Sequence, residues 1–400
     1  MKILYITHQY FPYFYTGTEL LTDNLSRYQR YLGYETEVWA YNLEGGDINK
    51  IQKTLYKGIP VTFFTHHNDD KDKDWKMYRD NPKRKKWFRE LLKKSAPDVI
   101  HVTHLARMGD IVQAAYELGI PYVTTITDYW LLCPTATLVR ENGELCGGTA
   151  IDSKCLRYCY KNKKRNMEER WSGVQDFLNK ATKVGYAANF VRSMFEKNGI
   201  DTSNWINVKH GYNPEVERKR TKDALYKFAF TGTLQPSKGG HLAIQAFRKV
   251  SDTKARLVVF GETKHNLDYS NYCRSLAEGD ARIEFRGRYD HTKLTKEFED
   301  IDCILVTSNW YEPFPFTLIS AVKYGFDIIG SRIGGIPEII GDSNSNSLFE
   351  PGDLDDLKNK MEKKILKGKK VVDRIFYEQT LETEGFKYFQ IYNFISGKNL

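Results

Sequence analysis

The sequence lacks the features of a membrane-spanning, secreted or repetitive protein. It contains no run of about 18 apolar residues, the length that a transmembrane helix needs. Its N-terminus, MKILYITHQYFPYF, has one Lys and then a strand-like apolar run, without the apolar segment and small-residue cleavage site of a signal peptide. We find no repeat with a period of roughly 20–50 residues and no low-complexity tract. These absences predict a cytoplasmic globular protein.

Cysteine is also scarce, since six Cys among 400 residues are too few for a disulfide framework. Four of them nevertheless fall in one stretch, at Cys133, Cys146, Cys155 and Cys159. Because thiolates are preferred ligands of zinc, this set predicts a structural Zn site. An iron–sulfur cluster and packed thiols without metal are the alternatives. A metal here would hold together an insertion at about residues 131–165 and would take no part in catalysis.

Positive charge is concentrated in one segment of a chain whose net charge is +9. Residues 71–94 contain 11 Lys or Arg against 4 Asp or Glu. From Pro82 onward this segment reads as a helix with Trp87, Phe88 and two leucines among the cations. One interpretation is peripheral contact with an anionic membrane surface; the other is a solvated helix whose apolar residues face the core. Specific binding of nucleic acid is not expected, because no recognisable module accompanies the charge.

A chain of this length predicts two domains, since domains usually contain about 100–200 residues. Strand patterns occur at 2–8, 35–41, 97–103, 121–127, 182–188 and 205–211, with helical patterns at 18–32 and 109–118. A second series has strands at 227–233, 255–261, 282–287, 302–308 and 326–331, with helices at 239–250 and 269–277. Alternation of this kind predicts parallel sheets covered on both faces. The expected fold class is therefore α/β, with two Rossmann-like, doubly wound domains that face a cleft and divide after residue 212.

The loops that follow the strands carry the candidate chemistry, because ligands of such sheets bind at the carboxyl ends of the strands. Gly17 and Thr18 open the first helix, where a glycine and a helix N-terminus favour a phosphate. Lys238 lies beside two glycines just before the helix at 239–250. One interpretation is that Lys238 is a cation that holds a diphosphate. The alternative is an exposed loop lysine.

Glu312 lies between aromatic residues in the loop after the strand at 302–308. The next helix begins at Phe316 or at the proline before it, so the backbone N–H groups of Phe316 and Thr317 would face an anion. Beside such a helix end, a carboxylate makes electrostatic sense if it accepts hydrogen bonds from sugar hydroxyls. The alternative is a carboxylate that caps its own helix.

These segments resemble a known family over nearly the whole chain. FTGTLQPSKGGHLAIQAF (230–247), SNWYEPFPFTLISAVKYG (308–325) and GGIPEI (334–339) are similar to the large retaining group of GT-B glycosyltransferases that includes sucrose synthases and bacterial mannosyl- and glucosyltransferases. TDYWLLCPTATLVRENGELC (127–146) resembles a segment of a bacterial subset. The resemblance, to family 4 or bacterial group 1, implies a retaining, metal-independent transfer from a nucleotide-diphosphate sugar to an acceptor hydroxyl. With the basic helix, it suggests envelope polysaccharide or glycolipid synthesis.

The resemblance also assigns roles to individual residues. Glu312 matches the first Glu of the family's Glu-x7-Glu motif, which contacts the donor sugar, and Lys238 matches the Lys that holds the donor diphosphate. Gly17 matches the glycine loop near that diphosphate. Asp128 is expected to orient the sugar or the acceptor, with a helix-capping Asp as the alternative. The implied donor site further includes Thr18, Thr233, Arg288, Tyr289, Phe314, Phe316, Thr317 and Ser320.

Several positions depart from the family pattern. Thr127, Thr233 and Ser320 stand where the family has its His, its Arg and the second Glu, and Pro315 replaces a glycine. These departures keep two alternatives open: a nucleotide-sugar epimerase of the same fold and a catalytically weak nucleotide-sugar-binding protein. By resemblance, residues 213–376 form the donor domain, and the helix within 377–400 crosses back to the N-terminal domain.

Overall fold

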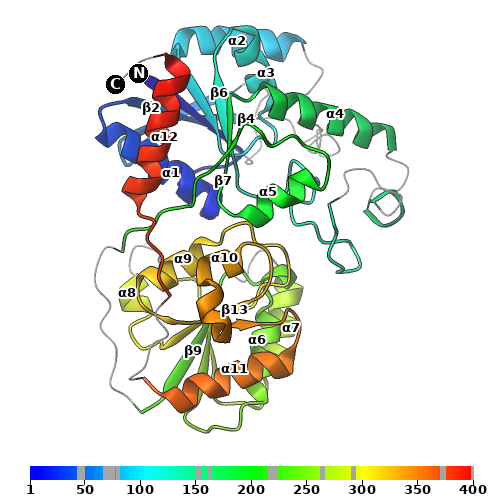
Figure 1. Ribbon diagram of the computed structural model, residues 1–400, viewed down its shortest axis with the longest axis vertical. Helices are drawn as coiled ribbons and strands as arrows, with labels where there is room; N and C mark the ends of the chain where they lie inside the picture. Colours follow the sequence, from blue (N-terminus) through cyan, green and yellow to red (C-terminus); the bar gives the residue numbers. More distant parts are fainter. Residues whose placement is uncertain are drawn as a thin grey trace. The chain divides into compact units, whose positions relative to one another are not determined.

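The computed structural model describes residues 1–42, 50–65, 77, 82–148, 155–159, 164–214, 224–261, 266–289, 294–369 and 375–397. The chain forms two compact units (Figure 1). Unit 1 comprises Met1–Gly211 together with Gln379–Leu400, and unit 2 comprises Tyr212–Glu378. Each unit has its own sheet.

The sheet of unit 1 has eight strands in the order β3-β4-β2-β1-β5-β6-β7-β8. Their bounds are β1 (Lys2–Thr7), β2 (Glu35–Asn42), β3 (Ile51–Tyr56), β4 (Ile59–Thr65), β5 (Val99–Val102), β6 (Tyr122–Ile126), β7 (Lys183–Tyr186) and β8 (Trp205–Asn207). Every pairing is parallel except that of β3 with β4. The central strand β1 is a nearly continuous apolar run, as a strand covered on both faces requires.

The helices of unit 1 are α1 (Gly17–Tyr31), α2 (Pro82–Ser95), α3 (Gly109–Glu117), α4 (Lys164–Lys180), α5 (Asn189–Glu196) and α12 (Leu381–Ser396), with a π-helical turn η2 at Cys155–Cys159. A capping box starts α1, because Thr16 and Glu19 bond to each other's backbone. Among the described residues, no helix is long and apolar enough to cross a membrane.

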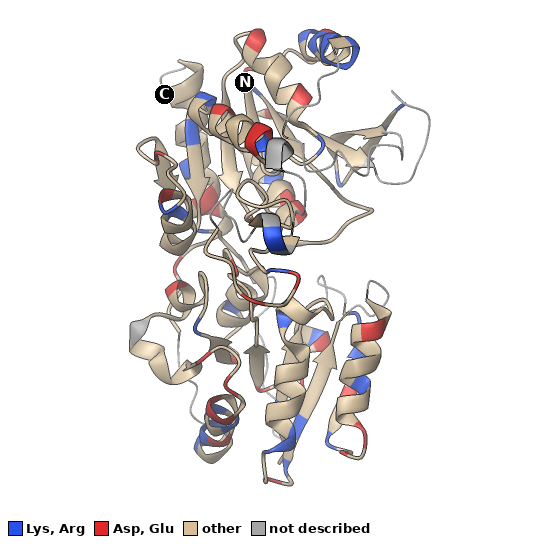
Figure 2. Ribbon diagram, turned by 90° about the vertical axis from the view of Figure 1, so that its right-hand side faces the viewer, with Lys and Arg blue, Asp and Glu red and all other residues tan. Residues whose placement is uncertain are grey.

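The basic helix α2 turns its apolar side toward the core of unit 1. Phe88 and Leu92 are fully buried, and the ring of Phe88 packs against Phe64 of β4. Lys and Arg line this helix (Figure 2), but several are engaged in ion pairs, as Arg84 is with Asp110 at 3.0 Å. This packing supports the solvated-helix interpretation, and membrane contact stays a prediction. Residues 71–76 and 78–81 of the basic segment lie outside the described residues.

Unit 2 has a parallel six-stranded sheet in the order β11-β10-β9-β12-β13-β14. The strands are β9 (Tyr226–Thr231), β10 (Ala255–Phe260), β11 (Ile283–Gly287), β12 (Cys303–Val306), β13 (Asp327–Ser331) and β14 (Leu348–Phe349). The helices are α6 (Gly240–Arg248), α7 (Leu267–Ala277), α8 (Leu294–Glu297), α9 (Phe316–Lys323), α10 (Ile336–Ile340) and α11 (Leu354–Lys367), with 3-10 turns η3 (Pro236–Lys238) and η5 (Asp342–Ser347).

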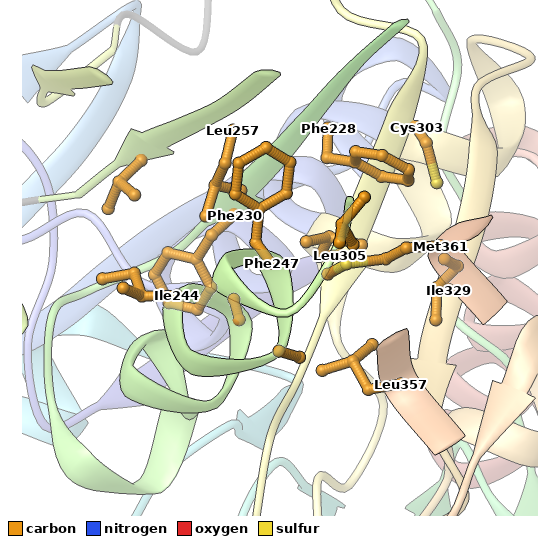
Figure 3. Close-up of a cluster of buried hydrophobic side chains, with 14 of the residues drawn as sticks. Phe228, Phe230, Ile244, Phe247, Leu257, Cys303, Leu305, Ile329, Leu357 and Met361 are labelled. Atoms are coloured by element: carbon orange, nitrogen blue, oxygen red, sulfur yellow. The ribbon is translucent and has the colours of Figure 1, made fainter. Parts of the chain in front are cut away.

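The core of unit 2 lies between the sheet and the helices α6 and α11 (Figure 3). Phe228 and Phe230 of β9 pack with Phe247 of α6 and Leu357 of α11, and all four are buried. Each such side chain contributes about 1.5–3 kcal/mol through burial. This core fixes the strand ends from which the loops of unit 2 start.

The final helix α12 packs on α1 and β5 of unit 1 through a buried hydrogen-bonded network. The hydroxyl of Tyr392 lies 2.6 Å from His101 Nδ1 and 3.3 Å from the hydroxyl of Tyr5. Thr125 Oγ1 lies 2.8 Å from His101 Nε2 and 2.5 Å from the hydroxyl of Tyr388. Burial lowers the pKa of His101 to about 3, so its ring stays neutral.

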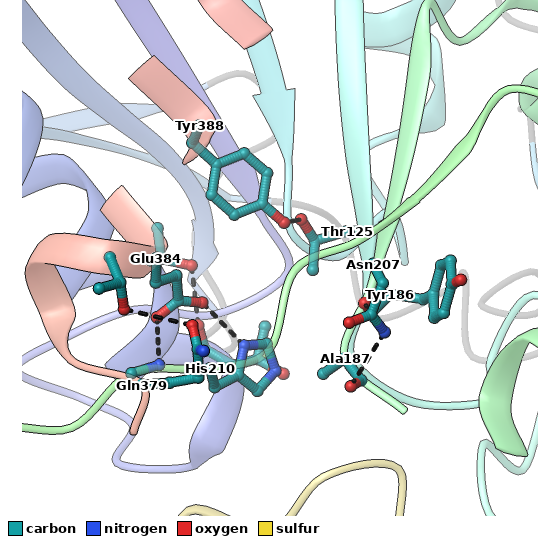
Figure 4. Close-up of polar contacts among 12 residues, drawn as sticks. Thr125, Tyr186, Ala187, Asn207, His210, Gln379, Glu384 and Tyr388 are labelled. Carbon is teal, nitrogen blue, oxygen red and sulfur yellow. Dashed lines mark hydrogen bonds and ion pairs between the residues drawn. The ribbon is translucent and has the colours of Figure 1, made fainter. Parts of the chain in front are cut away.

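A second group of bonds joins the start of α12 to the last segment of unit 1 before the crossing (Figure 4). Glu384 accepts a hydrogen bond from Gly211 N at 2.8 Å and lies 2.8 Å from His210 Nδ1. Gly211 packs so closely on the backbone of Thr380 that a Cβ would not fit. The structure therefore changes unit after Gly211 and returns at Gln379.

Candidate functional site

Three loops of unit 2 meet at the carboxyl edge of its sheet, because β9, β12 and β13 are neighbouring strands. The loop after β9 is bonded to the loop after β12 at two points. Thr307 Oγ1 donates to Gly239 O at 2.8 Å, and Asn309 N donates to Ser237 O at 2.9 Å. Gly239 has a φ of +71°, and a Cβ there would collide with Thr307 O. The glycine before α6 is therefore required by the close approach of these loops.

Lys238 and Glu312, placed in two of these loops, form an ion pair. Lys238 Nζ lies 2.6 Å from Glu312 Oε1, which also accepts hydrogen bonds from Ser308 Oγ and Trp310 Nε1, each at 2.7 Å. The Lys238 ammonium lies 5.0 Å from the centre of the Trp310 ring. Glu312 is buried, whereas Lys238 is about a quarter exposed, at 27 %. Lys238 is thus a positioned cation that a ligand can reach.

All three of these bonds go to Oε1 of Glu312. Within the described part of the chain, Oε2 accepts no hydrogen bond, and it is not among the buried atoms that lack a partner. The interpretation of Glu312 as a helix cap is wrong: α9 has Pro315 at its N-cap and no side-chain cap. The first helical bond of α9 runs from Leu318 N to Pro315 O, so Phe316 and Thr317 occupy the first turn.

The loop after β13 supports the backbone of Glu312. Gly335 N donates to Glu312 O at 2.7 Å, and Ser331 Oγ donates to Ser308 O at 2.6 Å. Gly334 has a φ of +59°, and a Cβ there would collide with the backbone of Glu312. The two glycines that follow β13 therefore determine where Glu312 can lie.

A small pocket of unit 2 brings together three of the predicted donor-site residues, Tyr289, Thr317 and Ser320. Its other lining residues are Thr231, Leu294, Phe298, Ile304, Ala321 and Phe326. Ser320 Oγ donates to Thr317 O at 3.0 Å, and burial raises the pKa of Tyr289 to about 12, which keeps its phenol neutral. The lining is thus uncharged.

The remaining predicted donor-site residues of unit 2 lie around this edge of the sheet without joining the pocket. Arg288 is exposed, Thr233 is half-buried in the loop after β9, and Phe314 is buried with its ring 6.1 Å from that of Tyr377. In unit 1, Gly17 is exposed at the first position of α1, and Thr18 is buried.

Asp128 belongs to unit 1, and it has a partner that the sequence reasoning missed. His104 Nε2 lies 3.0 Å from Asp128 Oδ2, and Trp130 N donates to Asp128 Oδ1 at 2.8 Å. Ala106 N donates to His104 Nδ1 at 3.2 Å, so the proton of the neutral ring is on Nε2 and faces Asp128. Asp128 is therefore neither alone nor a helix cap, because the residues after it form a turn.

Two further polar residues surround His104. The ring of His8 lies against that of His104, tilted by 37° with centroids 3.8 Å apart, and Glu19 is fully buried at the third position of α1. Burial lowers the pKa of His8 well below its ordinary value, and the positive charge of Arg107 acts in the same direction. Burial raises the pKa of Glu19. The signal for this group was a polar residue at the first or second position after each of the neighbouring strands β1, β5 and β6.

The cysteine segment does not support the predicted Zn site. Cys133, Cys146, Cys155 and Cys159 are all described, yet the described residues contain no group of three His, Cys, Asp or Glu arranged to hold a metal. Cys133 Sγ lies 3.1 Å from Thr135 Oγ1, and Gly148 N donates to Cys146 Sγ at 3.4 Å. Burial raises the pKa of Cys159, a backbone hydrogen bond at Glu141 lowers it, and the nearby Cys133, Glu141 and Cys146 raise it.

Comparison with known proteins decides the family. The model described as "Glycosyltransferase Family 4" matches residues 15–216, and the model described as "Glycosyl transferases group 1" matches residues 213–378. The chain belongs to glycosyltransferase family 4. An uncharacterized 42.6 kDa protein in the cps region of Klebsiella pneumoniae is 20 % identical to this family member over 366 residues, which cover 85 % of this chain and 87 % of that protein.

Solved structures match this family 4 member over its whole length. Sucrose-phosphate synthase from Thermosynechococcus elongatus has a TM-score of 0.73 at 15 % identity, with all of both chains covered. HepE of Anabaena, solved in complex with UDP-glucose, has a TM-score of 0.65 at 16 % identity and covers 100 % of this chain and 98 % of that one. With two Rossmann-like units, these matches show the GT-B fold.

Proposed function

We propose that this glycosyltransferase is a retaining, metal-independent enzyme that moves a sugar from a nucleoside-diphosphate donor to an acceptor hydroxyl. The observation that carries the proposal is the pairing of Lys238 with Glu312 at the carboxyl edge of the unit 2 sheet. The cation can bind the diphosphate of a nucleotide sugar, and the carboxylate held beside it can bind the sugar.

Lys238 is suited to the leaving group. Breaking the anomeric bond creates negative charge on the diphosphate, and a preorganised cation stabilises that charge more than water does. The first turns of α6 and α9 offer backbone N–H groups to the same anion. Because Lys238 is already held by Glu312 and stacked over Trp310, little reorganisation is needed when the diphosphate arrives.

Glu312 is suited to the sugar. Oε1 is occupied by Lys238, Ser308 and Trp310, so Oε2 remains to accept hydrogen bonds from donor-sugar hydroxyls. A carboxylate roughly doubles the strength of such a bond compared with a neutral acceptor. The assignment of Tyr289, Thr317 and Ser320 to the nucleoside rests on the resemblance, because the uncharged pocket that they line has room for about one water molecule.

Retention is proposed from the resemblance to the retaining group of GT-B glycosyltransferases. We assign retention to attack on the face from which the diphosphate leaves, with the departing phosphate accepting the proton of the acceptor hydroxyl. Asp128 of unit 1 is assigned to orienting the sugar or the acceptor, through the geometry that His104 imposes on it.

The class of donor and acceptor is proposed from the relatives. HepE of Anabaena was solved with UDP-glucose, which makes a UDP-sugar the first donor to test. The Klebsiella relative belongs to a cps region, which agrees with envelope polysaccharide or glycolipid synthesis. A cytoplasmic location with peripheral membrane contact through residues 71–94 remains a prediction.

The test is incubation of the full chain with radiolabelled UDP-, GDP- and ADP-sugars, followed by separation of nucleoside diphosphate, free sugar and sugar isomers. We expect slow release of nucleoside diphosphate from one donor, and faster release with an acceptor. Lys238→Ala combined with Glu312→Ala should reduce this rate by at least about 10²-fold, the effect of one lost preorganised donor. Lys249→Ala is the matched control, because Lys249 makes an exposed pair with Asp355 at 2.6 Å.

Each alternative function predicts a different product. Formation of a sugar isomer without release of nucleoside diphosphate would identify an epimerase, and saturable binding without turnover would identify a binding protein. Unchanged transfer in the Lys238/Glu312 double variant would refute the proposed site even if transfer itself is observed.

A further inference from the structure

A buried arginine of α4 contacts the loop that carries Asp128. Arg170 is only 3 % exposed, and charged side chains are seldom buried to this extent unless they are paired. Its Nη2 donates a hydrogen bond to the backbone O of Trp130, and its guanidinium lies 4.2 Å from the centre of the Trp130 ring. One side chain therefore fixes both the backbone and the ring of Trp130.

The same tryptophan is bonded to Asp128 and lies beside His104. Trp130 N donates to Asp128 Oδ1 at 2.8 Å, and the rings of Trp130 and His104 lie 5.7 Å apart, centroid to centroid. His104 Nε2 in turn lies 3.0 Å from Asp128 Oδ2. Trp130 and His104 thus each contact one oxygen of the carboxylate, and Arg170 supports Trp130 from α4.

The carboxylate that these contacts fix is open to a ligand. The side chain of Asp128 is 26 % exposed, whereas that of His104 is 6 % exposed, and both line the same small pocket. A carboxylate has about four acceptor positions, so two bonds leave room for a hydroxyl on either oxygen. The orientation in which Asp128 meets such a hydroxyl is determined by the bonds that it already makes.

A buried guanidinium is suited to fixing a position rather than to adding stability. Taking an ion out of water is costly, and an apolar side chain of similar volume often stabilises a fold equally well. The planar guanidinium instead combines a directional hydrogen bond with stacking on an aromatic ring. α4 is a helix of 17 residues, and its Phe177 lines the pocket that contains Asp128. A helix holds a site more precisely than a loop does.

We propose that Arg170 is a positioning residue that keeps the Asp128 carboxylate in the orientation needed to bind a hydroxyl of the sugar or of the acceptor. It acts through the backbone and the ring of Trp130. The consequence for sugar transfer rests on the proposed function, whereas the orientation of Asp128 by Arg170 does not.

The first test is a double-mutant cycle between Arg170 and Asp128, with UDP-glucose as the probe and release of UDP as the readout. Misplacing an orienting group by about 1 Å costs about 10²-fold in rate. Arg170→Met and Asp128→Asn should therefore each lower kcat/KM by about this factor. The double variant should be no slower than Asp128→Asn, because Arg170 acts through Asp128. The dissociation constant for UDP, whose proposed site is in unit 2, should not change in Arg170→Met.

Arg282 provides the matched control, because it makes the same two kinds of contact in unit 2. Its Nη1 donates to Val250 O at 2.7 Å, and its guanidinium lies 5.0 Å from the centre of the Phe247 ring. Arg282→Met should lower the free energy of unfolding and leave kcat/KM unchanged. If Arg170→Met does not fold, Arg170→Lys replaces it in the cycle, because lysine keeps the charge but loses the planar donor group.

Three outcomes of the cycle overturn the inference. They are a wild-type kcat/KM in the Arg170 variant, a loss that multiplies with that of Asp128→Asn, and a loss that Arg282→Met shares. A wild-type kcat/KM in Asp128→Asn also overturns it, because the carboxylate would then have no hydroxyl to orient. Each of these results leaves the proposed function standing, since sugar transfer is still observed in the wild type.

If the wild type does not turn over UDP-glucose, NMR of the histidine Cε1–H groups measures the orientation of Asp128 directly. The His104 resonance, assigned by its loss in His104→Gln, should move in Asp128→Asn, which changes its bonded partner. It should also move in Arg170→Lys, because the Trp130 ring beside it is displaced, and should stay in place in Arg282→Met. An unmoved His104 resonance in Arg170→Lys overturns the inference.

Discussion

At the scale of single residues, the hydrogen-bond partners of a buried polar group indicate whether it has a structural role or can bind a substrate. Both nitrogens of His101 are hydrogen-bonded, to Tyr392 and Thr125, so this ring stabilises the seam between β5 and α12. Glu312 is also buried, but one of its oxygens accepts no bond within the described residues. A fully satisfied group has nothing left to offer a substrate, whereas a half-satisfied carboxylate does.

The low pKa of His101 predicts that the folded protein loses stability in acid. Its folded-state pKa is about 3, below the ordinary 6.5. Between these values the unfolded chain binds a proton that the folded chain does not, so stability falls as pH falls below 6.5, while above 6.5 both forms are neutral. From pH 7 to pH 5 this residue should remove about 2 kcal/mol. Urea unfolding at the two pH values measures it.

The control for this prediction is His101→Gln, which retains a hydrogen-bonding side chain without titrating in this range. The variant is expected to be less stable at pH 7 but to lose about 2 kcal/mol less than the wild type between pH 7 and pH 5. An identical pH dependence in both proteins would show that another group is responsible.

Contacts between residues that are far apart in the sequence were the hardest to predict from it. Lys238 and Glu312 were identified because each lies in a glycine- or proline-containing loop that matches a family motif. The pairing of His104 with Asp128 depends on β5 and β6 being neighbours, and the ring contact of His8 with His104 depends on β1 and β5 being neighbours. Local periodicity does not give the order of the strands in a sheet. The contacts among His8, His104 and Asp128 were therefore found only in the structure.

At the scale of elements, most strands with apolar runs were predicted. The predicted strands of both series are present, usually shorter by one or two residues at their ends. Both strands of the hairpin β3–β4 were missed: β3 is a partly exposed edge strand, and β4 is a buried apolar strand that contains Pro60. The helices α4, α5 and α11 and the two-residue strand β14 were also missed.

The loop after β13 gives an element-scale prediction. Gly334→Ala should cost about 1 kcal/mol for a positive φ and about 1–3 kcal/mol more for the collision with the backbone of Glu312. Displacing Glu312 by about 1 Å should lower kcat/KM about 10²-fold. Steady-state kinetics and urea unfolding measure the two effects.

Gly352→Ala is the matched control for this loop. Gly352 also has a positive φ, of +82°, but a Cβ there would meet nothing within 4 Å. It should therefore show the backbone cost of about 1 kcal/mol with unchanged kcat/KM. If both variants lost activity equally, the loop after β13 would not be what positions Glu312.

At the scale of the whole molecule, unit 1 is discontinuous in sequence: α12 returns to it after the chain has formed unit 2. Tyr392 is fully buried in the seam of unit 1, whereas Phe394 of the same helix is 75 % exposed. Tyr392→Ala should therefore destabilise unit 1 by about 3–5 kcal/mol. Phe394→Ala should change stability by no more than about 0.5 kcal/mol.

Tryptophan fluorescence can follow this prediction, because six of the seven Trp residues belong to unit 1 and only Trp310 to unit 2. Urea unfolding of Tyr392→Ala should shift the transition seen by the unit 1 tryptophans. In a Trp310→Phe background the shift should persist. A shift of equal size in Phe394→Ala would mean that α12 is not bound through the seam described.

The return of α12 also sets the order in which the two units can mature during synthesis. The ribosome releases residues 212–378 before Tyr388 and Tyr392, so the second sheet has all its strands while the first still lacks the helix that covers Tyr5 and His101. A nascent chain that stalls in the last turns of α12 would thus carry a complete second sheet while Tyr5 and His101 of unit 1 are still uncovered. Unit 1 can therefore close over Tyr5 and His101 only after unit 2 has been synthesised.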